Sequence, residues 1–126
     1  MNVLDDRQYL KTHEWVSTLE DGHVRIGISD HAQEAMGDLV FVDLPEVGDD
    51  FSAGDSVVVV ESVKAVSDVY TPFSGRVFAI NELLLDEPAS VNENPYGAWL
   101  VELEDVGEGE VLSAQEYIAL LEQEEA

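Results

Sequence analysis

The sequence of 126 residues predicts a mostly β protein, a small sandwich or flattened barrel with two helices. Short runs with the composition of strands are separated by Gly, Pro, Asn and Asp, which favours an all-β architecture over an α/β fold. Residues 57–60 are four consecutive valines, and such a run indicates a strand covered on both sides. The expected strands are 14–19, 24–28, 39–44, 56–61, 66–70, 76–80 and 99–103.

A short helix is expected over residues 30–36, between the second and third of these strands. Ser29 or Asp30 can cap its first turn, and Gly37 is the residue type that commonly ends a helix. The small apolar side of this helix consists of Ala32, Ala35 and Met36.

The fourth and fifth strands flank a segment with mirror symmetry around Lys64-Ala65. The mirrored pairs are Val63 with Val66, Ser62 with Ser67, Glu61 with Asp68, Val60 with Val69, and Val59 with Tyr70. A two-residue loop at Lys64-Ala65 would place these pairs opposite each other in an antiparallel ladder. The loop lacks the Asn-Gly or Asp-Gly that such hairpins favour, so something other than turn propensity selects Lys64-Ala65.

Lys64 is one of two lysines in the chain, and three roles are open to it: catalyst, solvated surface charge or attachment point. A catalytic lysine needs a lowered pKa, whereas the nearby Glu61 and Asp68 favour the charged ammonium. A chain that has replaced nearly every other lysine with acid, yet keeps one at the tip of a hairpin, points to covalent attachment of a prosthetic group.

A second helix is expected at the C-terminus. Ser113 and Glu116 have the spacing of a capping box, and Leu112 and Tyr117 occupy the flanking hydrophobic-staple positions. Tyr117, Leu120 and Leu121 form one apolar stripe that must pack on the sheets. Glu122, Glu124 and Glu125 lie at the negative end of the helix dipole, so this end is expected to fray.

Length and composition limit the number of domains, the available redox chemistry and the cellular location. The length predicts a single domain, residues 1–126. The absence of cysteine excludes disulfides and thiolate chemistry, so any redox sulfur must belong to a cofactor. No apolar stretch is long enough to span a bilayer, and the acidic start of the chain is unlike a signal sequence; we therefore expect a cytoplasmic protein. We also expect a monomer.

The net charge of −23, from 28 acids against five Lys and Arg, excludes nucleic acid and anionic membranes as partners. The acids are spread over a chain that is 45% hydrophobic, which indicates a folded protein with an acidic surface. Because molar salt shortens the Debye length to a few ångströms, such a surface predicts a halophilic host with a salty cytoplasm; an ordinary acidic protein is the alternative.

Other chemical motifs are weak. His13, His23 and His31 lack helical metal-ligand spacing, so we expect surface or hydrogen-bonded histidines and no metal site. Asp30, Glu34 and Asp38 form a carboxylate cluster that chance explains in so acidic a chain. No phosphate loop or nucleophile elbow is present, and the sequence predicts no catalytic residues and no enzyme activity.

Several segments, in order and with conventional spacing, resemble the lipoyl-bearing H proteins of the glycine cleavage system. The most specific is the lysine hairpin with the prolyl turn that follows it. The matching segments are 60–70 with Pro72 and Ser74-Gly75, His13-Glu14-Trp15-Val16, 27–34, 37–45, Val91-Asn92 and 94–97.

The resemblance implies a flattened barrel-sandwich hybrid of the lipoyl/biotinyl-domain type, with lipoate attached to Lys64. It further implies a carrier that takes the aminomethyl group of glycine from a pyridoxal-phosphate decarboxylase (P protein) to a tetrahydrofolate-dependent aminomethyltransferase (T protein). A dihydrolipoamide dehydrogenase (L protein) reoxidises the arm, and a lipoate ligase or lipoyl transferase loads it.

The resemblance also assigns roles to four further residues. Glu61 corresponds to the acid that the lipoylating enzyme recognises, the alternative being an exposed strand carboxylate. Thr12, Glu14 and Asp68 correspond to positions lining the cleft where the loaded arm rests. Some family members have a histidine where this chain has Ala35, so an arm-locking scheme that depends on that histidine does not carry over.

Three alternatives stay open. A biotinyl carrier shares the hairpin, but its lysine is flanked by methionines, where this chain has Val63 and Ala65. A lipoyl donor that relays the group to other enzymes has the same sequence features. The third alternative is a free-standing enzyme or a structural interaction module, which an unmodified Lys64 in native protein would favour.

Overall fold

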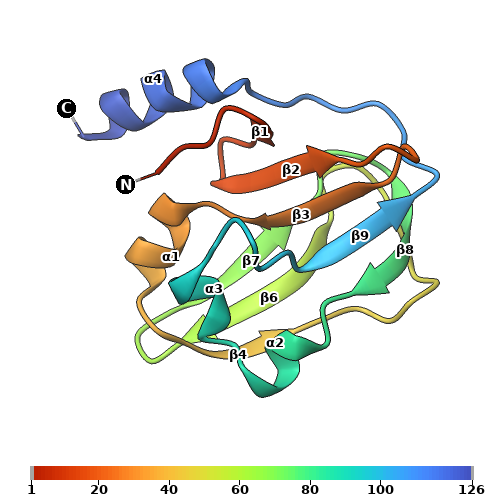
Figure 1. Ribbon diagram of the computed structural model, residues 1–126, viewed down its shortest axis with the longest axis horizontal. Coiled ribbons are helices and arrows are strands. Elements are labelled where there is room, and N and C mark those ends of the chain that lie inside the picture. Colours follow the sequence, from red (N-terminus) through yellow and green to blue (C-terminus); the bar gives the residue numbers. More distant parts are fainter. Residues whose placement is uncertain (1, 126) are drawn as a thin grey trace.

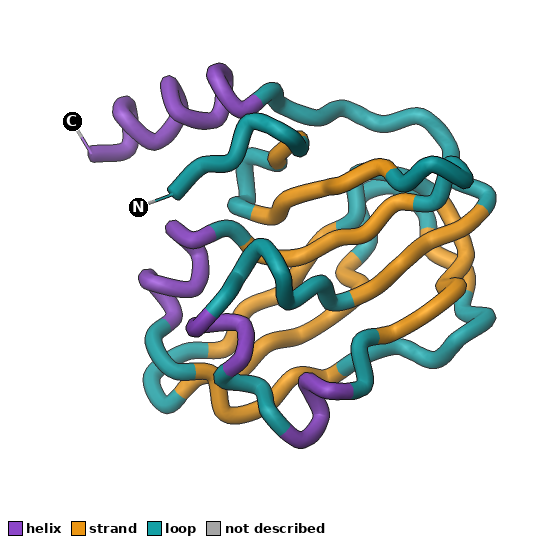
Figure 2. Tube along the Cα trace, in the orientation of Figure 1, coloured by secondary structure: helices purple, strands orange, loops and turns teal. Residues whose placement is uncertain are grey.

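The computed structural model describes residues 2–125, without the side chain of Glu125, and arranges them as two antiparallel sheets with short helices around them (Figure 1, Figure 2). The larger sheet contains, in spatial order, β1 (Gln8–Tyr9), β2 (Glu14–Thr18), β3 (Val24–Ile28), β9 (Val101–Glu104), β8 (Gly75–Ile80) and β5 (Asp50–Phe51). The smaller sheet contains β4 (Leu39–Asp43), β6 (Ser56–Ser62) and β7 (Val66–Tyr70).

The predicted mostly β fold is confirmed, with one refinement: over residues 2–125 the two sheets stay separate and do not close into a barrel. All seven predicted strands are present within one or two residues of their expected ends. The sequence did not predict β1 and β5, which are two residues each. These short strands are defined by their pairing with β2 and β8, and the local sequence of two residues has no pattern that predicts a strand.

The run of four valines has a different cause from the one predicted. The register of β6 against β7 shifts between Ser56 and Val58, which marks a bulge at Val57. The extra residue lets Val57 and Val58 both be buried, and Val60 is buried as well. Val59 is only partly buried on the outer side, so β6 is not fully covered on both faces as expected.

Both predicted helices form with the expected caps. α1 (Asp30–Met36) begins after Ser29, whose Oγ accepts a hydrogen bond from the Ala32 N–H at 3.2 Å, and ends at Gly37 with φ 78°. In α4 (Ala114–Glu125) the Ser113 N–H donates to Glu116 at 2.9 Å and the Glu116 N–H donates to Ser113 Oγ at 3.1 Å. Two four-residue helices, α2 (Leu83–Asp86) and α3 (Ser90–Glu93), are too short to have been predicted.

The main hydrophobic core lies between the sheets, where Ile26, Val60, Val77 and Leu103 are almost completely buried. A second cluster forms where α4 packs beside β1 (Figure 1): Tyr117 and Leu121 contact Tyr9 and Trp15. The rings of Tyr9 and Tyr117 stack with centroids 4.4 Å apart. The predicted apolar stripe of the C-terminal helix is therefore the surface that packs on the larger sheet.

Candidate functional site

The β6–β7 hairpin carries Lys64 at its tip, and a serine side chain shapes the turn. The Ser62 N–H donates to the Ala65 carbonyl at 2.8 Å. Ser62 Oγ accepts from the backbone N–H groups of Ala65 at 3.0 Å and of Lys64 at 3.3 Å. A hydroxyl that accepts from the backbone in this way supports a turn without glycine, and it leaves Val63 and Lys64 as the two central residues.

The predicted hairpin register is therefore wrong by two residues. Glu61 pairs with Val66 and Val59 with Asp68, so the mirror point lies between Val63 and Lys64. A shift of two keeps every residue on its predicted face, because side chains alternate with period two. Lys64 is exposed at the tip as expected, and its neighbour Val63 is 86% exposed.

Glu61 lies on the outer face of the smaller sheet, one step from the turn. Across the three strands it stands in one row with Phe41 of β4 and Val66 of β7. Phe41 is 48% exposed and Val66 66% exposed, so apolar surface flanks the Glu61 carboxylate on both sides. Ser62 and Ala65 separate this row from the two central residues of the turn, Val63 and Lys64.

The C-terminal end of α1 lies beneath the lysine. A Cβ atom built on Gly37 would lie 3.3 Å from Lys64 Cε and 3.8 Å from its Nζ, so the lysine stem rests against the bare glycine backbone. Asn92 of α3 holds this end of α1: its Nδ2 donates to the Gly37 carbonyl at 2.8 Å, and its Oδ1 accepts from Leu39 N–H at 2.9 Å. Ala35 is exposed.

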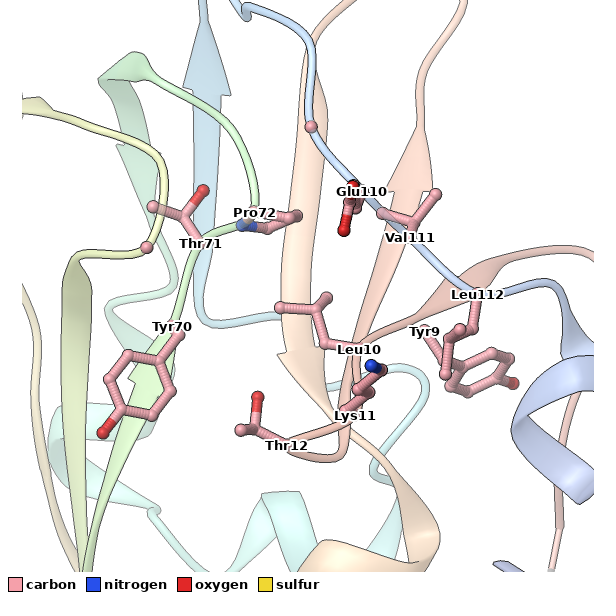
Figure 3. A pocket seen from close by; sticks show the side chains of 12 residues that line it. Tyr9, Leu10, Lys11, Thr12, Tyr70, Thr71, Pro72, Glu110, Val111 and Leu112 are labelled. Carbon is pink, nitrogen blue, oxygen red and sulfur yellow. The ribbon is translucent and has the colours of Figure 1, made fainter. Parts of the chain in front are cut away.

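An open cleft of about 910 Å³ lies at the far end of β7 from the turn (Figure 3). Four segments line it: the end of β1 with the turn to β2, the loop between β5 and β6 at Gly54, the end of β7 with the residues that follow it, and the connection that leads to α4. The lining residues include Leu10, Lys11, Thr12, Tyr70, Pro72 and Glu110. Thr12 and Tyr70 come from opposite walls of the opening (Figure 3).

Beneath the cleft, Glu14 is 1% exposed and joins two of its walls. The Thr12 hydroxyl donates to one carboxylate oxygen, and the Tyr70 N–H donates to the other at 2.6 Å. Burial raises the pKa of Glu14 above its ordinary value of 4.5, although both hydrogen bonds act in the opposite direction. Sequence reasoning alone did not reveal this burial.

Asp68 is placed differently from Thr12 and Glu14. Its carboxylate accepts a hydrogen bond from Ser56 Oγ at 2.8 Å, on the exposed side of β6 and β7. Among the described residues, Asp68 is not part of the cleft lining. The structure thus brings together Thr12 and Glu14, while Asp68 makes a separate contact.

Comparison with known proteins shows which family this chain belongs to. Residues 7–125 match the profile of the glycine cleavage H-protein family. The chain belongs to this family. It is 50% identical over 123 residues to glycine cleavage system H protein 2 of Pseudomonas putida, covering 95% of this chain and 97% of that protein. It is 53% identical over 121 residues to the glycine cleavage system H protein of Alcanivorax borkumensis, covering 93% and 94%.

A solved structure agrees with the sequence relatives. The crystal structure of a glycine cleavage system H protein from Mycobacterium marinum superposes with a TM-score of 0.89 at 44% sequence identity. The match covers 95% of this chain and 99% of that one. The family resemblance predicted from the hairpin and its flanking segments is confirmed, and the fold is that of an H protein.

In this H-protein fold His13 and His23 are hydrogen-bonded, as expected from the sequence. His23 contacts Glu102 at 2.9 Å. His13 and His31 lie together with ring centroids 4.4 Å apart.

Within the part of the chain that the structure describes, no helix is both long and apolar enough to cross a membrane.

Replacing Glu14 with glutamine is expected to change the pH dependence of stability. The folded chain binds the Glu14 proton more tightly than the unfolded chain, so ionisation of this buried group removes stability as the pH rises above about 4.5. Glutamine can accept from Tyr70 and donate to Thr12, but it carries no charge. Relative to the parent chain, Glu14→Gln should therefore gain stability toward neutral pH, on the order of 1 kcal/mol.

The measurement is urea unfolding at a series of pH values in constant molar KCl. Asp43→Asn removes one charge at an exposed strand position and controls for the general loss of negative charge. A stability difference between parent and Glu14→Gln that stays constant over the series, or that falls with rising pH, would contradict the raised pKa.

Proposed function

We propose that this H-protein chain is a lipoyl-bearing carrier of the glycine cleavage system, with residues 1–126 acting as one carrier domain in the cytoplasm. Lipoate would be joined to Lys64 by an amide bond between its carboxyl carbon and Nζ. The observation that carries the proposal is Lys64 itself, an exposed lysine at the tip of a hairpin whose turn is braced by Ser62.

The residues present suit this attachment. Within residues 2–125, the Lys64 ammonium has no ion-pair partner, so no contact must be broken before an enzyme acylates it. The stem crosses Gly37, where a side chain would crowd it. When bound, the lipoyl group supplies the sulfur chemistry that accepts the aminomethyl group from the decarboxylase and yields it to the aminomethyltransferase.

The cleft is the proposed resting place of the arm. Tyr70 lies four residues beyond Val66 on β7, which puts the cleft roughly 13 Å from the turn at a rise of about 3.3 Å per residue. A lipoyl-lysine side chain has a comparable length. Thr12 would face the loaded arm directly, with the buried Glu14 carboxylate behind it favouring a positively charged amine.

The role of Asp68 in this cleft rests on the family resemblance, because its observed contact is with Ser56. Reuse of one tethered arm by successive enzymes raises its effective concentration at each of them. The proposed partners are the decarboxylase, the aminomethyltransferase, the dihydrolipoamide dehydrogenase and the lipoate ligase or lipoyl transferase, each bound in turn to a monomer. The chain itself would supply no acid or base.

Glu61→Ala is expected to slow lipoylation without loss of the fold. A contact to a charged group contributes about 1.5–3 kcal/mol, so losing one to the lipoylating enzyme should slow the reaction by about tenfold or more. Truncation of a partly exposed strand residue should change the stability by only about 0.5 kcal/mol. Initial rates of lipoate incorporation by a lipoate ligase, read by intact mass, measure the effect.

Asp43→Ala is the matched control, because Asp43 lies on the adjacent strand opposite Val59, on the same face as Glu61 and further from the turn. It should leave the rate unchanged. An unchanged rate for Glu61→Ala would reduce Glu61 to a surface charge, and equal slowing of both variants would indicate a general effect of negative charge.

A further inference from the structure

A cluster of three possible metal ligands lies outside the lining of the cleft, although one of them, His13, stands between Thr12 and Glu14 in the sequence. His13 comes from the turn before β2, His31 from the first turn of α1, and Glu124 from the last turn of α4. One nitrogen of each ring and one carboxylate oxygen all lie within 4.8 Å of one another. The closest approach joins His13 Nε2 and a Glu124 oxygen at 3.3 Å.

Hydrogen bonds already orient one of these rings. His13 Nδ1 lies 2.8 Å from the Tyr117 hydroxyl, and that hydroxyl lies 2.8 Å from Ser29 Oγ. If His13 donates to Tyr117 and Tyr117 donates to Ser29, His13 Nε2 presents a bare lone pair to the Glu124 carboxylate. Two electron-rich atoms in this arrangement need a cation between them, and a metal-ligating histidine typically makes such a hydrogen bond through its other nitrogen.

The second imidazole ring of the cluster, that of His31, has a nitrogen to which no described residue is bound. His31 Nδ1 is buried and has no hydrogen-bond partner among the described residues. An unpartnered nitrogen of this kind is costly in a folded protein unless something binds it. If the Tyr117 hydroxyl instead donates to His13 Nδ1, the ring proton of His13 lies on Nε2. A metal ion that binds Nε2 would displace this proton.

We propose that His13, His31 and Glu124 form a binding site for a divalent transition-metal ion such as Zn²⁺. Imidazole suits Zn²⁺, Ni²⁺ and Cu²⁺, whereas Mg²⁺ and Ca²⁺ prefer sites made of oxygen alone. With bonds of about 2.0–2.1 Å, tetrahedral zinc needs ligand atoms roughly 3.3 Å apart, so side-chain movements of at most about 1.5 Å complete the site. Water would fill the fourth position.

The site would tie the end of α4 to the rest of the molecule. It joins three elements that are distant in the sequence, and Tyr117, which orients His13, also anchors α4 in the second core cluster. The acidic C-terminal turn would then be held by the metal against its expected tendency to fray.

A second histidine cluster on the molecule provides the matched control. Asp21, His23 and Glu102 also approach one another, but the cluster has one imidazole only. Arg25 already contacts the other oxygen of Glu102 at 2.9 Å and supplies the positive charge. This cluster is therefore not expected to take the metal.

The experiment is isothermal titration of Zn²⁺ into the metal-free full chain, in molar KCl with excess Mg²⁺ to occupy the acidic surface. We expect one Zn²⁺ per chain, and His31→Gln and Glu124→Gln should each weaken binding by about tenfold or more. His23→Gln should bind as the parent does. Circular dichroism melts in EDTA identify whether each variant keeps the parental fold.

Two further readouts separate a built site from surface attraction. Co²⁺ should give the visible absorption bands of a low-coordinate nitrogen and oxygen site, and Zn²⁺ should slow hydrogen exchange of the α4 amides in the parent but not in His31→Gln. Binding that excess Mg²⁺ abolishes, that His31→Gln and Glu124→Gln leave unchanged, or that His23→Gln removes instead would overturn the proposal.

Discussion

Lys64→Arg is expected to abolish lipoylation completely, because the attachment needs an amine that can lose its proton. Arginine preserves the positive charge and most of the stem, but its guanidinium stays protonated and does not form the amide. The fold should be unaffected, since Lys64 is exposed at a turn that Ser62 stabilises through its own side chain. Intact mass after incubation with lipoate and a lipoate ligase measures the loss.

Lys11→Arg is the control for this experiment, because Lys11 is the other lysine of the chain and is also exposed. It should be lipoylated at the parental rate, with the added mass on the peptide containing Lys64. Modification that persists in Lys64→Arg would refute the attachment site. The mass added to protein from its native host separates a lipoyl group from a biotinyl group, and an unmodified native chain would favour a structural module.

The second large effect is expected from salt. The chain has a net charge of −23, and ion pairs with arginine or histidine engage only six acids among the described residues. Folding brings the remaining carboxylates closer together, and at low ionic strength a Debye length of about 30 Å leaves them unscreened. The thermal midpoint should therefore rise, on the order of 10 °C, from tens of millimolar to molar KCl.

Circular dichroism melts across the salt range measure this rise, with size-exclusion chromatography to show that the chain stays monomeric. KCl and NaCl should act alike at equal ionic strength if screening is the cause, while a neutral osmolyte such as sucrose separates screening from water exclusion. A midpoint that is constant or falls with salt would refute the proposed salt adaptation and leave the carrier assignment intact.

The hairpin shows that an incorrect register can still place the right lysine at the tip of a turn. The mirrored residues located Lys64 at the tip, but the turn is set by hydrogen bonds to Ser62 Oγ, and these move the mirror point by one position. The valine run was misread for a similar reason, because a bulge at Val57 gives two successive buried residues. Both features depend on geometry that residue type alone does not specify.

The helix ends were predictable, since caps are local. Each capping residue acts within one turn of its own helix. Ser29 and Gly37 cap the two ends of α1, and Ser113 and Glu116 form the predicted capping box of α4. The exposed lysine, the strand pattern and the acidic surface are equally properties of short segments or of composition. These features were determined by the sequence itself and needed no knowledge of which strands pair.

Only the tertiary structure decided the chemistry around these segments. It buried Glu14 by bringing Tyr70 to it from 56 residues away, and it set His13 against Tyr117 across 104 residues. It also placed the Lys64 side chain over Gly37, and it placed the Asp68 carboxylate where it accepts a hydrogen bond from Ser56 Oγ. Burial and pairing of this kind are set by the packing of distant elements around a common core, because desolvation depends on every neighbour in space and on few neighbours along the chain.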